Sequence, residues 1–167
     1  MASPASIGKH PIHPMLVAFP IALWIFSLAA DVIYLWRGNP IWKNYIAFYT
    51  LLGGILGAAA AAVPGFIDWL SIKDRATKKI ANWHARLNVI ALLIFIADFY
   101  LRTTSGASFV SGDLTIPLVL SIVGIVLIGI SGWLGGEMVY VHGVAVDTAS
   151  EIRPEPVVRS ETRNRAA

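Results

Sequence analysis

The chain contains no cysteine and few charged residues. Of its 167 residues, 14% are charged and 56% are hydrophobic, whereas an average soluble domain has about 25% charged residues. The lack of cysteine excludes disulfides, iron–sulfur clusters, thiolate zinc sites, cysteine nucleophiles and covalently attached c-type haem. The scarcity of charge excludes a disordered chain and argues against a water-soluble globule. The composition therefore indicates a membrane protein.

The sequence also lacks the motifs of the common soluble enzymes. No phosphate-binding loop, dinucleotide fingerprint or Ser/His/Asp set is found along it, so any catalytic residues are unknown at this stage. It has neither an aromatic platform nor a basic face of its own, which excludes nucleic acid as a partner.

Four apolar segments are long enough to cross a bilayer, which needs about 20 helical residues. They run from about 15 to 36, 45 to 69, 83 to 101 and 116 to 142. Short connections between long helices favour antiparallel neighbours. We therefore expect an all-α, integral membrane, four-helix up-down bundle with both termini on the same side. The expected divisions are a His-Pro segment at 1–13, the transmembrane domain at 14–146 and a disordered charged tail at 147–167.

The basic residues predict the orientation of this bundle. Ten of the 13 lysines and arginines fall at the end that carries the termini, and the other three are Arg37, Lys43 and Arg102. Because cytoplasmic loops carry the excess of Lys and Arg, we expect both termini in the cytoplasm. The expected location is the inner (plasma) membrane, crossed several times, and the first expected partner is the lipid bilayer.

The first and third apolar segments resemble each other. Residues 21–26 align with 90–95, and Ala30-Asp31 aligns with Ala97-Asp98 when small gaps are allowed. Such a repeat describes two helical hairpins related by an axis along the membrane normal. Equivalent groups would then face each other at the centre of the bundle.

Small residues at four-residue spacing predict close helix packing. The second segment carries Gly53, Gly57, Ala61 and Gly65, and the fourth carries Gly132 and Gly136. Small-xxx-small patterns let a neighbouring backbone approach. The same faces are candidates for homo-oligomer contacts.

All four histidines, at positions 10, 13, 84 and 142, fall at the end expected in the cytoplasm. His10 and His13 each precede a proline, which favours extended or polyproline backbone and predicts that the two rings point the same way. Pro14 suits the first position of a helix. We treat these four histidines, with Asn88, as candidate cofactor-binding residues.

Polar residues of the third segment share one helical face. The face comprises His84, Asn88, Ala91, Phe95, Asp98 and Arg102, and a polar stripe on an apolar helix is expected to face the interior. Asn88, one turn after His84, is placed to accept a ring N–H and set the tautomer.

Asp31 and Asp98 are intramembrane acids near the other end of the bundle. Asp31 shares a stripe with Val17, Pro20, Trp24 and Ser27. Intramembrane ionisable residues are functional candidates. Two interpretations stay open: proton-relay groups, or ion pairs with Arg37, Lys43 or Arg102.

The histidines allow three interpretations. Haem b needs two axial imidazoles from facing helices, for which His84 and His142 are candidates, with Lys78, Lys79 and Arg86 as partners of the propionates. A non-haem transition metal needs three or more ligands, available from His13, His84, His142, Asp68 and Glu137. The third interpretation is that the histidines only form hydrogen bonds.

Several motifs resemble a bacterial membrane family known only as domain of unknown function 2231. They are HPxHPxLVxFPIAL at 10–23, GxxDW at 65–69, HxxxN at 84–88 and GGEMVYxHG at 135–143. The resemblance covers residues 8 to 146 and implies a four-helix inner-membrane domain. Some members of that family are attached to Rieske-type iron–sulfur domains, which favours electron transfer. Because this chain has no cysteine, its redox partner would be a separate protein.

The sequence thus predicts a membrane redox subunit that binds haem or a metal. Two alternatives need no cofactor: a small proton-linked transporter that uses Asp31 and Asp98, or a structural assembly subunit held by its glycine ridge.

Overall fold

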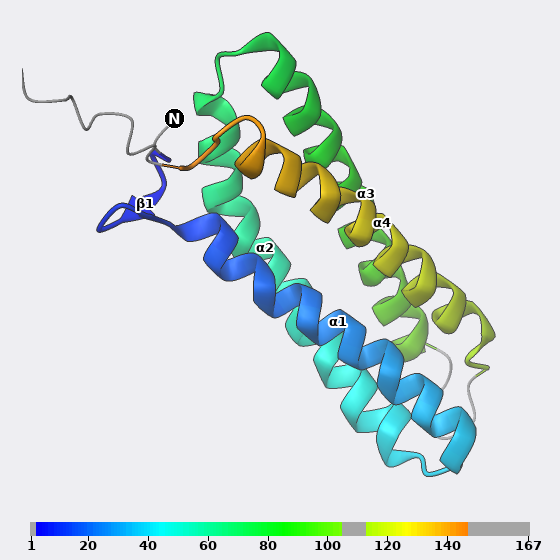
Figure 1. Ribbon diagram of the computed structural model, residues 1–167. Helices are drawn as coiled ribbons and strands as arrows, with labels where there is room; N and C mark the ends of the chain where they lie inside the picture. The colour runs from blue at the N-terminus through cyan, green and yellow to red at the C-terminus, as the bar shows by residue number, and fades with distance from the viewer. Residues whose placement is uncertain (1–2, 105–112, 147–167) are drawn as a thin grey trace, which may run out of the picture.

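The computed structural model describes residues 3–104 and 113–146 and is almost entirely helical (Figure 1). A two-stranded hairpin comes first, followed by four long helices. The elements are β1 (Ser6–Ile7), β2 (His10–Pro11), α1 (Ile12–Arg37), η1 (Trp42–Ala47), α2 (Phe48–Ser71), α3 (Arg75–Thr104) and α4 (Thr115–Tyr140). The tail expected at 147–167 lies outside the described residues.

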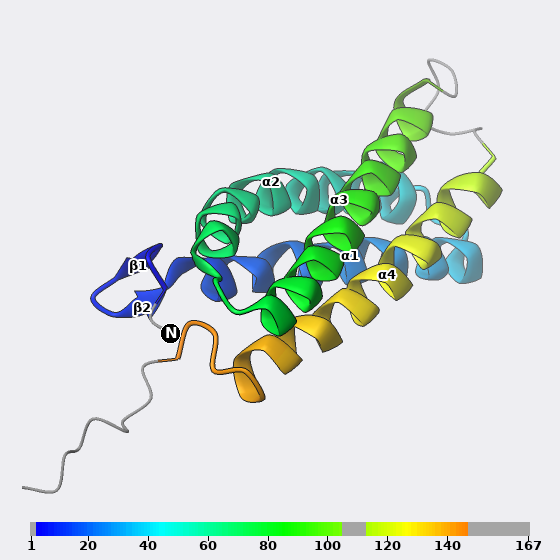
Figure 2. The ribbon, with the colours of Figure 1, turned by 90° about the horizontal axis from the view of Figure 1, so that it is seen from above.

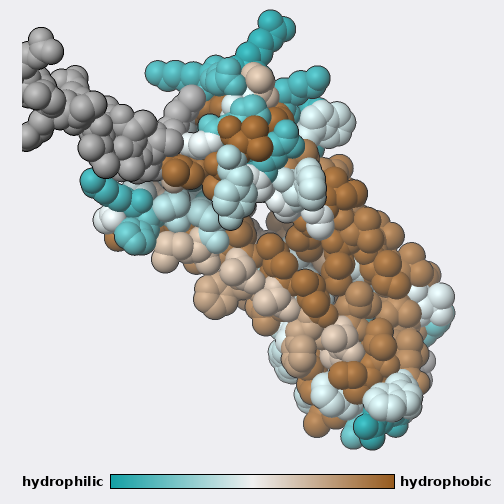
Figure 3. Space-filling view, viewed as in Figure 1, coloured by the Kyte–Doolittle hydropathy of each residue, from teal (hydrophilic) through white to brown (hydrophobic). Residues whose placement is uncertain are grey.

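The four helices confirm the predicted all-α membrane bundle. Each helical segment, with η1 and α2 taken together as Trp42–Ser71, is long and apolar enough to cross a membrane. Large hydrophobic side chains such as Phe19, Leu56 and Val126 are exposed, and Figure 3 shows an apolar surface along the length of the helices. An apolar exterior of this extent requires a lipid environment.

The bundle consists of two helical hairpins that cross. Most contacts between helices lie within the pairs α1–α2 and α3–α4, and fewer join the two pairs. Figure 2 shows the α3–α4 hairpin lying obliquely across the α1–α2 hairpin. The N-terminal hairpin, the connection from α2 to α3 and the end of α4 lie together at one end of the molecule (Figure 1); this is called the histidine end below.

Three groups of side chains lie between α1 and α3, from one end of the bundle to the other. His13 faces His84 at the histidine end, Trp24 stacks on Phe95 in the middle with ring centroids 4.1 Å apart, and Asp31 and Asp98 approach Arg102 at the far end. The histidines and the stacked aromatics are each separated by 71 residues in sequence. The facing arrangement expected from the repeat is therefore present, but in a register different from the alignment of 21–26 with 90–95.

Glycines let α1 and α3 approach their hairpin partners. A Cβ at Gly57 would lie 3.3 Å from Pro20, and one at Gly124 would lie 2.6 Å from Phe95. The predicted ridge of α2 thus packs on α1. The predicted ridge of α4 was wrong: a Cβ at Gly132 would meet nothing within 4 Å, and one at Gly136 would meet only Tyr140 of the same helix. The face of α4 that packs on α3 instead carries Gly124 and Gly135, which lie against the rings of Phe95 and His84.

The extended or polyproline backbone predicted before α1 is confirmed at His10 and Pro11, but it does not continue to His13, which is already helical. His10 and Pro11 form β2, which pairs antiparallel with β1, and α1 already begins at Ile12. The two-residue turn at Gly8 and Lys9 has φ values of 56° and 67°, as a tight hairpin turn requires. Backbone pairing with β1 fixes the extended geometry that the prolines favour, and Pro14 becomes the third residue of α1.

Candidate functional site

His13 and His84 meet at the interface between the two hairpins. Their ring centroids are 6.3 Å apart and their planes are inclined by 87°. His13 is the second residue of α1, and His84 lies in the third turn of α3. Because they occupy equivalent positions in the two hairpins, the crossing that stacks Trp24 on Phe95 also brings these imidazoles together.

Each imidazole is oriented by a main-chain carbonyl of its hairpin partner. Nδ1 of His13 lies 2.8 Å from the oxygen of Ala61 on α2, and Nδ1 of His84 lies 2.8 Å from the oxygen of Ser131 on α4. A carbonyl oxygen only accepts hydrogen bonds, so both Nδ1 atoms carry the proton and donate it. In the neutral rings, both Nε2 atoms therefore keep a lone pair.

Two glycines make room for these rings. A Cβ at Gly65 would lie 2.6 Å from Nδ1 of His13, and a Cβ at Gly135 would lie 3.2 Å from Cε1 of His84. A side chain at Gly65 would collide with the imidazole, and one at Gly135 would crowd it. Glycine thus places both rings directly against the backbones of α2 and α4.

His84 is held by more partners than His13. Ser131 Oγ lies 3.0 Å from its Nδ1, and the Asn88 amide nitrogen lies 3.0 Å from its Nε2. Asn88 therefore donates to the ring, whereas we predicted that it would accept a ring N–H. The carbonyl of Ser131 takes that N–H instead. Within the described residues, His13 forms one hydrogen bond, to Ala61.

The structure places the other candidate ligands elsewhere. Nδ1 of His142 is 3.2 Å from Thr77 Oγ1, Nδ1 of His10 is 2.8 Å from the oxygen of Gly8, and Asp68 accepts hydrogen bonds from Ser3 Oγ and Ala5 N. Glu137 caps the end of α4 through its carbonyl oxygen. In residues 3–104 and 113–146, no group of three or more His, Cys, Asp or Glu side chains could hold a metal ion. The ring that faces His84 is that of His13 and not that of His142.

Asp74 connects His142 to the start of α3. Its carboxylate accepts hydrogen bonds from Thr77 Oγ1 at 2.7 Å and from Thr77 N at 2.8 Å. These bonds, that of the Thr77 hydroxyl first, lower the pKa of Asp74 below its ordinary value. Because the Thr77 hydroxyl donates to Asp74, it accepts from Nδ1 of His142.

The intramembrane acids form ion pairs at the far end of the bundle. Arg102 contacts Asp31 at 2.6 Å and Asp98 at 2.8 Å. The ion-pair interpretation, with Arg102 as the partner, is thus confirmed. It also removes Arg102 from the cations that flank the membrane, because its side chain is only 6% exposed.

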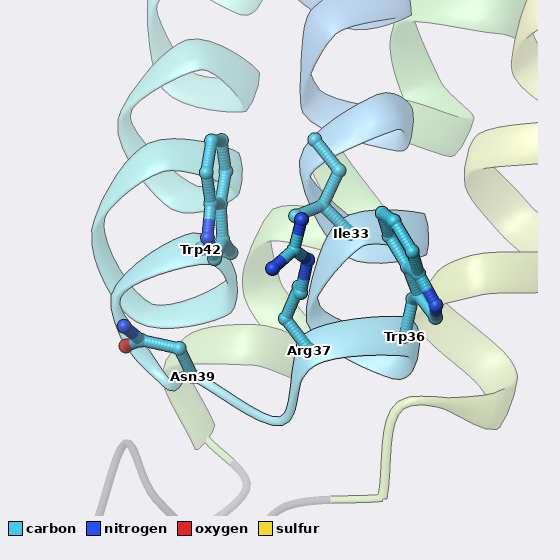
Figure 4. Close-up of a pocket in the computed structure, with 5 residues that line it drawn as sticks. All are labelled: Ile33, Trp36, Arg37, Asn39 and Trp42. Atoms are coloured by element: carbon cyan, nitrogen blue, oxygen red, sulfur yellow. The ribbon is translucent and has the colours of Figure 1, made fainter.

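A surface pocket lies at the same far end. Ile33, Trp36, Arg37, Asn39 and Trp42 line it (Figure 4), and the guanidinium carbon of Arg37 lies 4.3 Å from the ring centroid of Trp36. None of the residues predicted to bind a cofactor lines this pocket. The aromatic and basic side chains there are those expected where a helix meets the membrane surface.

Sequence reasoning did not single out Ser131 or the contact of Gly65 with His13. Ser131 lies 47 residues after His84, and Gly65 lies 52 residues after His13, each on the second helix of the hairpin that carries the histidine. The signal was present as an internal match: Ala61 and Gly65 in α2 correspond to Ser131 and Gly135 in α4, each pair separated by 70 residues.

The comparisons with known proteins identify a family without a described activity. The family model described as "Predicted membrane protein (DUF2231)" matches residues 9–148. No curated protein matches the chain, and no solved structure matches it. Because the match covers most of the chain, including all four helices, the protein belongs to the family of domain of unknown function 2231.

Proposed function

We propose that this protein is a redox subunit of the bacterial inner membrane that binds haem b through His13 and His84. The observation that carries the proposal is the facing pair of imidazoles, each with Nδ1 hydrogen-bonded to a helix carbonyl and with ring centroids 6.3 Å apart. His13 replaces His142 as the partner of His84 in the sequence-based hypothesis.

The distance between the rings suits a shared metal. Metal–imidazole bonds are about 2.0 Å long, so two such bonds and the radii of both rings amount to roughly 6 Å between centroids. Rings that pack edge to face in direct contact also have centroids about 4.5–7 Å apart. The separation of 6.3 Å is therefore compatible with one ion held between the two rings.

The hydrogen bonds at Nδ1 supply the second support. Histidines that bind a metal donate their other ring N–H to a carboxylate or a backbone carbonyl, which fixes the tautomer and the ring orientation. Ala61 and Ser131 perform that role on the two sides of the pair. Haem binding would require the Asn88 amide to leave Nε2 of His84, and its contacts with His84 O at 2.9 Å and Ser131 Oγ at 2.7 Å satisfy it without that bond.

The surroundings of the pair fit a haem. Figure 3 shows an opening between the two hairpins where the polar histidine end meets the apolar surface. Lys79 and Arg86 are exposed on α3 and are the proposed partners of the propionates, and the guanidinium carbon of Arg86 lies 5.3 Å from the Trp83 ring centroid. Lys78 is less suitable, because its ammonium donates to the carbonyl of Trp69 and lies over the Trp69 ring.

The proposal includes a place in the cell and a partner. The excess of basic residues at the histidine end supports cytoplasmic termini, with residues 14–146 as the membrane domain between the segments 1–13 and 147–167. Because the chain has no cysteine for an iron–sulfur cluster, a separate redox protein is proposed to exchange electrons with the haem. Homo-oligomer formation through small-residue faces stays a prediction.

The test is haem binding by detergent-purified protein from cells supplied with haem precursors. The expected result is a Soret band with one haem per chain, lost in His13→Ala and in His84→Ala. The matched controls are His10→Ala and His142→Ala, which should keep the band because neither ring faces the pair.

Metal analysis of the same samples separates haem from a bare ion. A transition metal without a Soret band, lost in the same two variants, would keep the two-imidazole centre and replace haem by a non-haem metal. Neither haem nor metal in folded protein would overturn the proposal in favour of the cofactor-free alternatives, the proton-linked transporter and the assembly subunit.

A further inference from the structure

The surface pocket at the far end of the bundle lies between the end of α1 and the start of η1 (Figure 4). It has a volume of about 480 Å³, which is within the range of small-molecule sites. Its walls are the side chains of Ile33, Trp36, Arg37, Asn39 and Trp42, and Figure 4 shows Arg37 between the two indole rings. Because α1, a candidate membrane span, ends at Arg37, the pocket lies where the chain would leave the apolar part of a membrane.

The guanidinium of Arg37 has no acidic partner in residues 3–104 and 113–146. The ion pairs found there join Arg102 to Asp31 and to Asp98. The guanidinium carbon of Arg37 instead lies 4.3 Å from the ring centroid of Trp36, and none of its five N–H donors forms a hydrogen bond with a described residue. The C-terminus of a helix attracts a cation, which explains the position of Arg37 but leaves these donors available to a ligand.

The side chains that line the pocket offer donors and no unused acceptor. Oδ1 of Asn39 accepts a hydrogen bond from Ile41 N at 3.0 Å, so its amide nitrogen and two N–H groups remain for a ligand. The indoles of Trp36 and Trp42 are donors only. A ligand that matches these walls is therefore rich in acceptors and negatively charged. Phosphate oxygens meet both conditions, and arginine binds them in pairs.

The second membrane span is distorted at this pocket. It begins with η1, which is a π-helical turn, and Trp42 is the first residue of that turn. Such turns occur frequently at functional sites. This observation is independent of charge, because regular α-helical geometry is interrupted at the residue that forms one wall of the pocket.

We propose that this pocket binds the phosphate group of an anionic membrane phospholipid, with Arg37 as its counter-ion. Tryptophan side chains are typical of the level of the lipid headgroups. The exposed ring of Phe26 lies two helical turns before Ile33, on the same face of α1, and supplies an apolar surface for acyl chains. A zwitterionic headgroup fits less well, because the lining side chains offer no free acceptor to its ammonium group.

The lipid site goes beyond the proposed haem site and does not depend on it. His13 and His84 lie at the histidine end, and neither lines the pocket. A failure of haem binding therefore leaves this inference untouched, and the reverse holds as well.

The test is native mass spectrometry of the detergent-purified full-length protein during titration with phosphatidylglycerol. The expected result is a bound lipid whose affinity falls about tenfold in Arg37→Gln, the usual effect of losing hydrogen bonds to a charged group. Asn39→Ala should weaken binding as well, because it removes two further donors. Lys73→Gln is the matched control: it removes one exposed cation between α2 and α3, at the other end of the bundle, and should leave the affinity unchanged.

Two further ligands identify the group that is bound. Diacylglycerol with the same acyl chains lacks the phosphate and should not bind to the wild type, and inorganic phosphate should not displace the lipid. Equal affinity of the wild type and Arg37→Gln for phosphatidylglycerol, equal weakening by Lys73→Gln, or diacylglycerol binding as tight as that of phosphatidylglycerol would overturn the inference. Displacement by inorganic phosphate would overturn the assignment to a lipid in favour of a soluble anion.

Discussion

The proton positions on His13 and His84 are set by the backbones of neighbouring helices. Each Nδ1 donates to a main-chain carbonyl of a neighbouring helix: His13 donates to Ala61 on α2, and His84 donates to Ser131 on α4. The close approach of ring and backbone depends on the glycines that follow, Gly65 and Gly135, four residues along each helix. A methyl group added at either glycine should therefore displace the imidazole that lies against it, while the histidine itself is unchanged.

We predict that Gly65→Ala weakens haem binding about tenfold or more, the usual effect of disturbing a ligand's supporting contacts. The new Cβ would lie 2.6 Å from Nδ1 of His13 and would force the ring to move. Gly132→Ala is the control, because a Cβ there meets nothing within 4 Å. Haem titration of both purified variants is the measurement, and equal affinities would contradict the assigned role of Gly65.

Asp74 supplies a pH-dependent contribution to stability at the histidine end. Its pKa in the folded chain is lowered, first by the Thr77 hydroxyl and then by the Thr77 backbone N–H. Folding therefore gains from ionised Asp74 above the pKa of the unfolded chain, about 3.9, and this gain disappears as the pH falls through the lower folded value.

We expect thermal unfolding temperatures measured between about pH 5 and pH 3 to fall less steeply in Asp74→Asn than in the wild type. Asparagine still accepts a hydrogen bond at this helix start but has no carboxylate to protonate. Identical slopes for the two proteins would show that Asp74 does not contribute to the acid sensitivity.

Residue-level features were predicted to different extents from the sequence. The buried face of α3 followed from helical periodicity, and Ala91, Phe95 and Asp98 are buried as expected. The partner of His84 did not follow, because sequence places His10, His13 and His142 at one end but does not specify how the hairpins cross. Likewise, the sequence named Arg102 as only one of three possible partners for Asp31.

At the scale of elements, each hairpin is packed through glycines that face a bulky ring. Gly54 of α2 lies against Trp24 of α1, and Gly124 of α4 lies against Phe95 of α3. The same two rings stack on each other across the hairpins. Packing within the hairpins thus positions the contact between them.

We predict that Gly54→Leu lowers the stability of the bundle by about 1–3 kcal/mol, the usual cost of overpacking a filled interior. Trp24 already occupies the space of the new side chain and is itself fixed by Phe95. Gly129→Leu on α4 is the control, since a Cβ there meets nothing within 4 Å. Thermal unfolding in detergent is the measurement, and equal destabilisation by both substitutions would contradict this packing.

The elements themselves were largely predictable, because long apolar segments admit only helices in a membrane. Their ends were less so. The helix of the third apolar segment, expected to start a turn or two before residue 83, begins at Arg75, where Asp74 accepts the hydrogen bond of Thr77 N. The extended backbone expected at His10 is present, but its pairing with Ser6 and Ile7 is a contact that the preference of a single residue does not reveal.

At the scale of the whole molecule, the two ends of the bundle differ in charge. The histidine end carries Lys73, Lys79 and Arg86, whereas Arg102 at the far end is withdrawn into an ion-pair cluster. This asymmetry is stronger than the sequence count suggested, and it supports a cytoplasmic histidine end.

Because the chain has no cysteine, a single introduced one reports the orientation. We expect Asn39→Cys, between α1 and η1, to react with a membrane-impermeant maleimide in intact spheroplasts. Lys73→Cys, between α2 and α3, should react only in inside-out vesicles. The opposite pattern of labelling would place the histidine end outside the cell.

His13 and His84, whose ring planes are inclined by 87°, would together hold one haem. Electron paramagnetic resonance of the oxidised, haem-loaded protein is the decisive measurement of this pairing. We expect a strongly anisotropic low-spin signal, as two imidazole ligands with perpendicular ring planes produce, and its absence from His13→Ala, which does not retain haem. A high-spin signal from the wild type, or a low-spin signal that persists in His13→Ala, would contradict it.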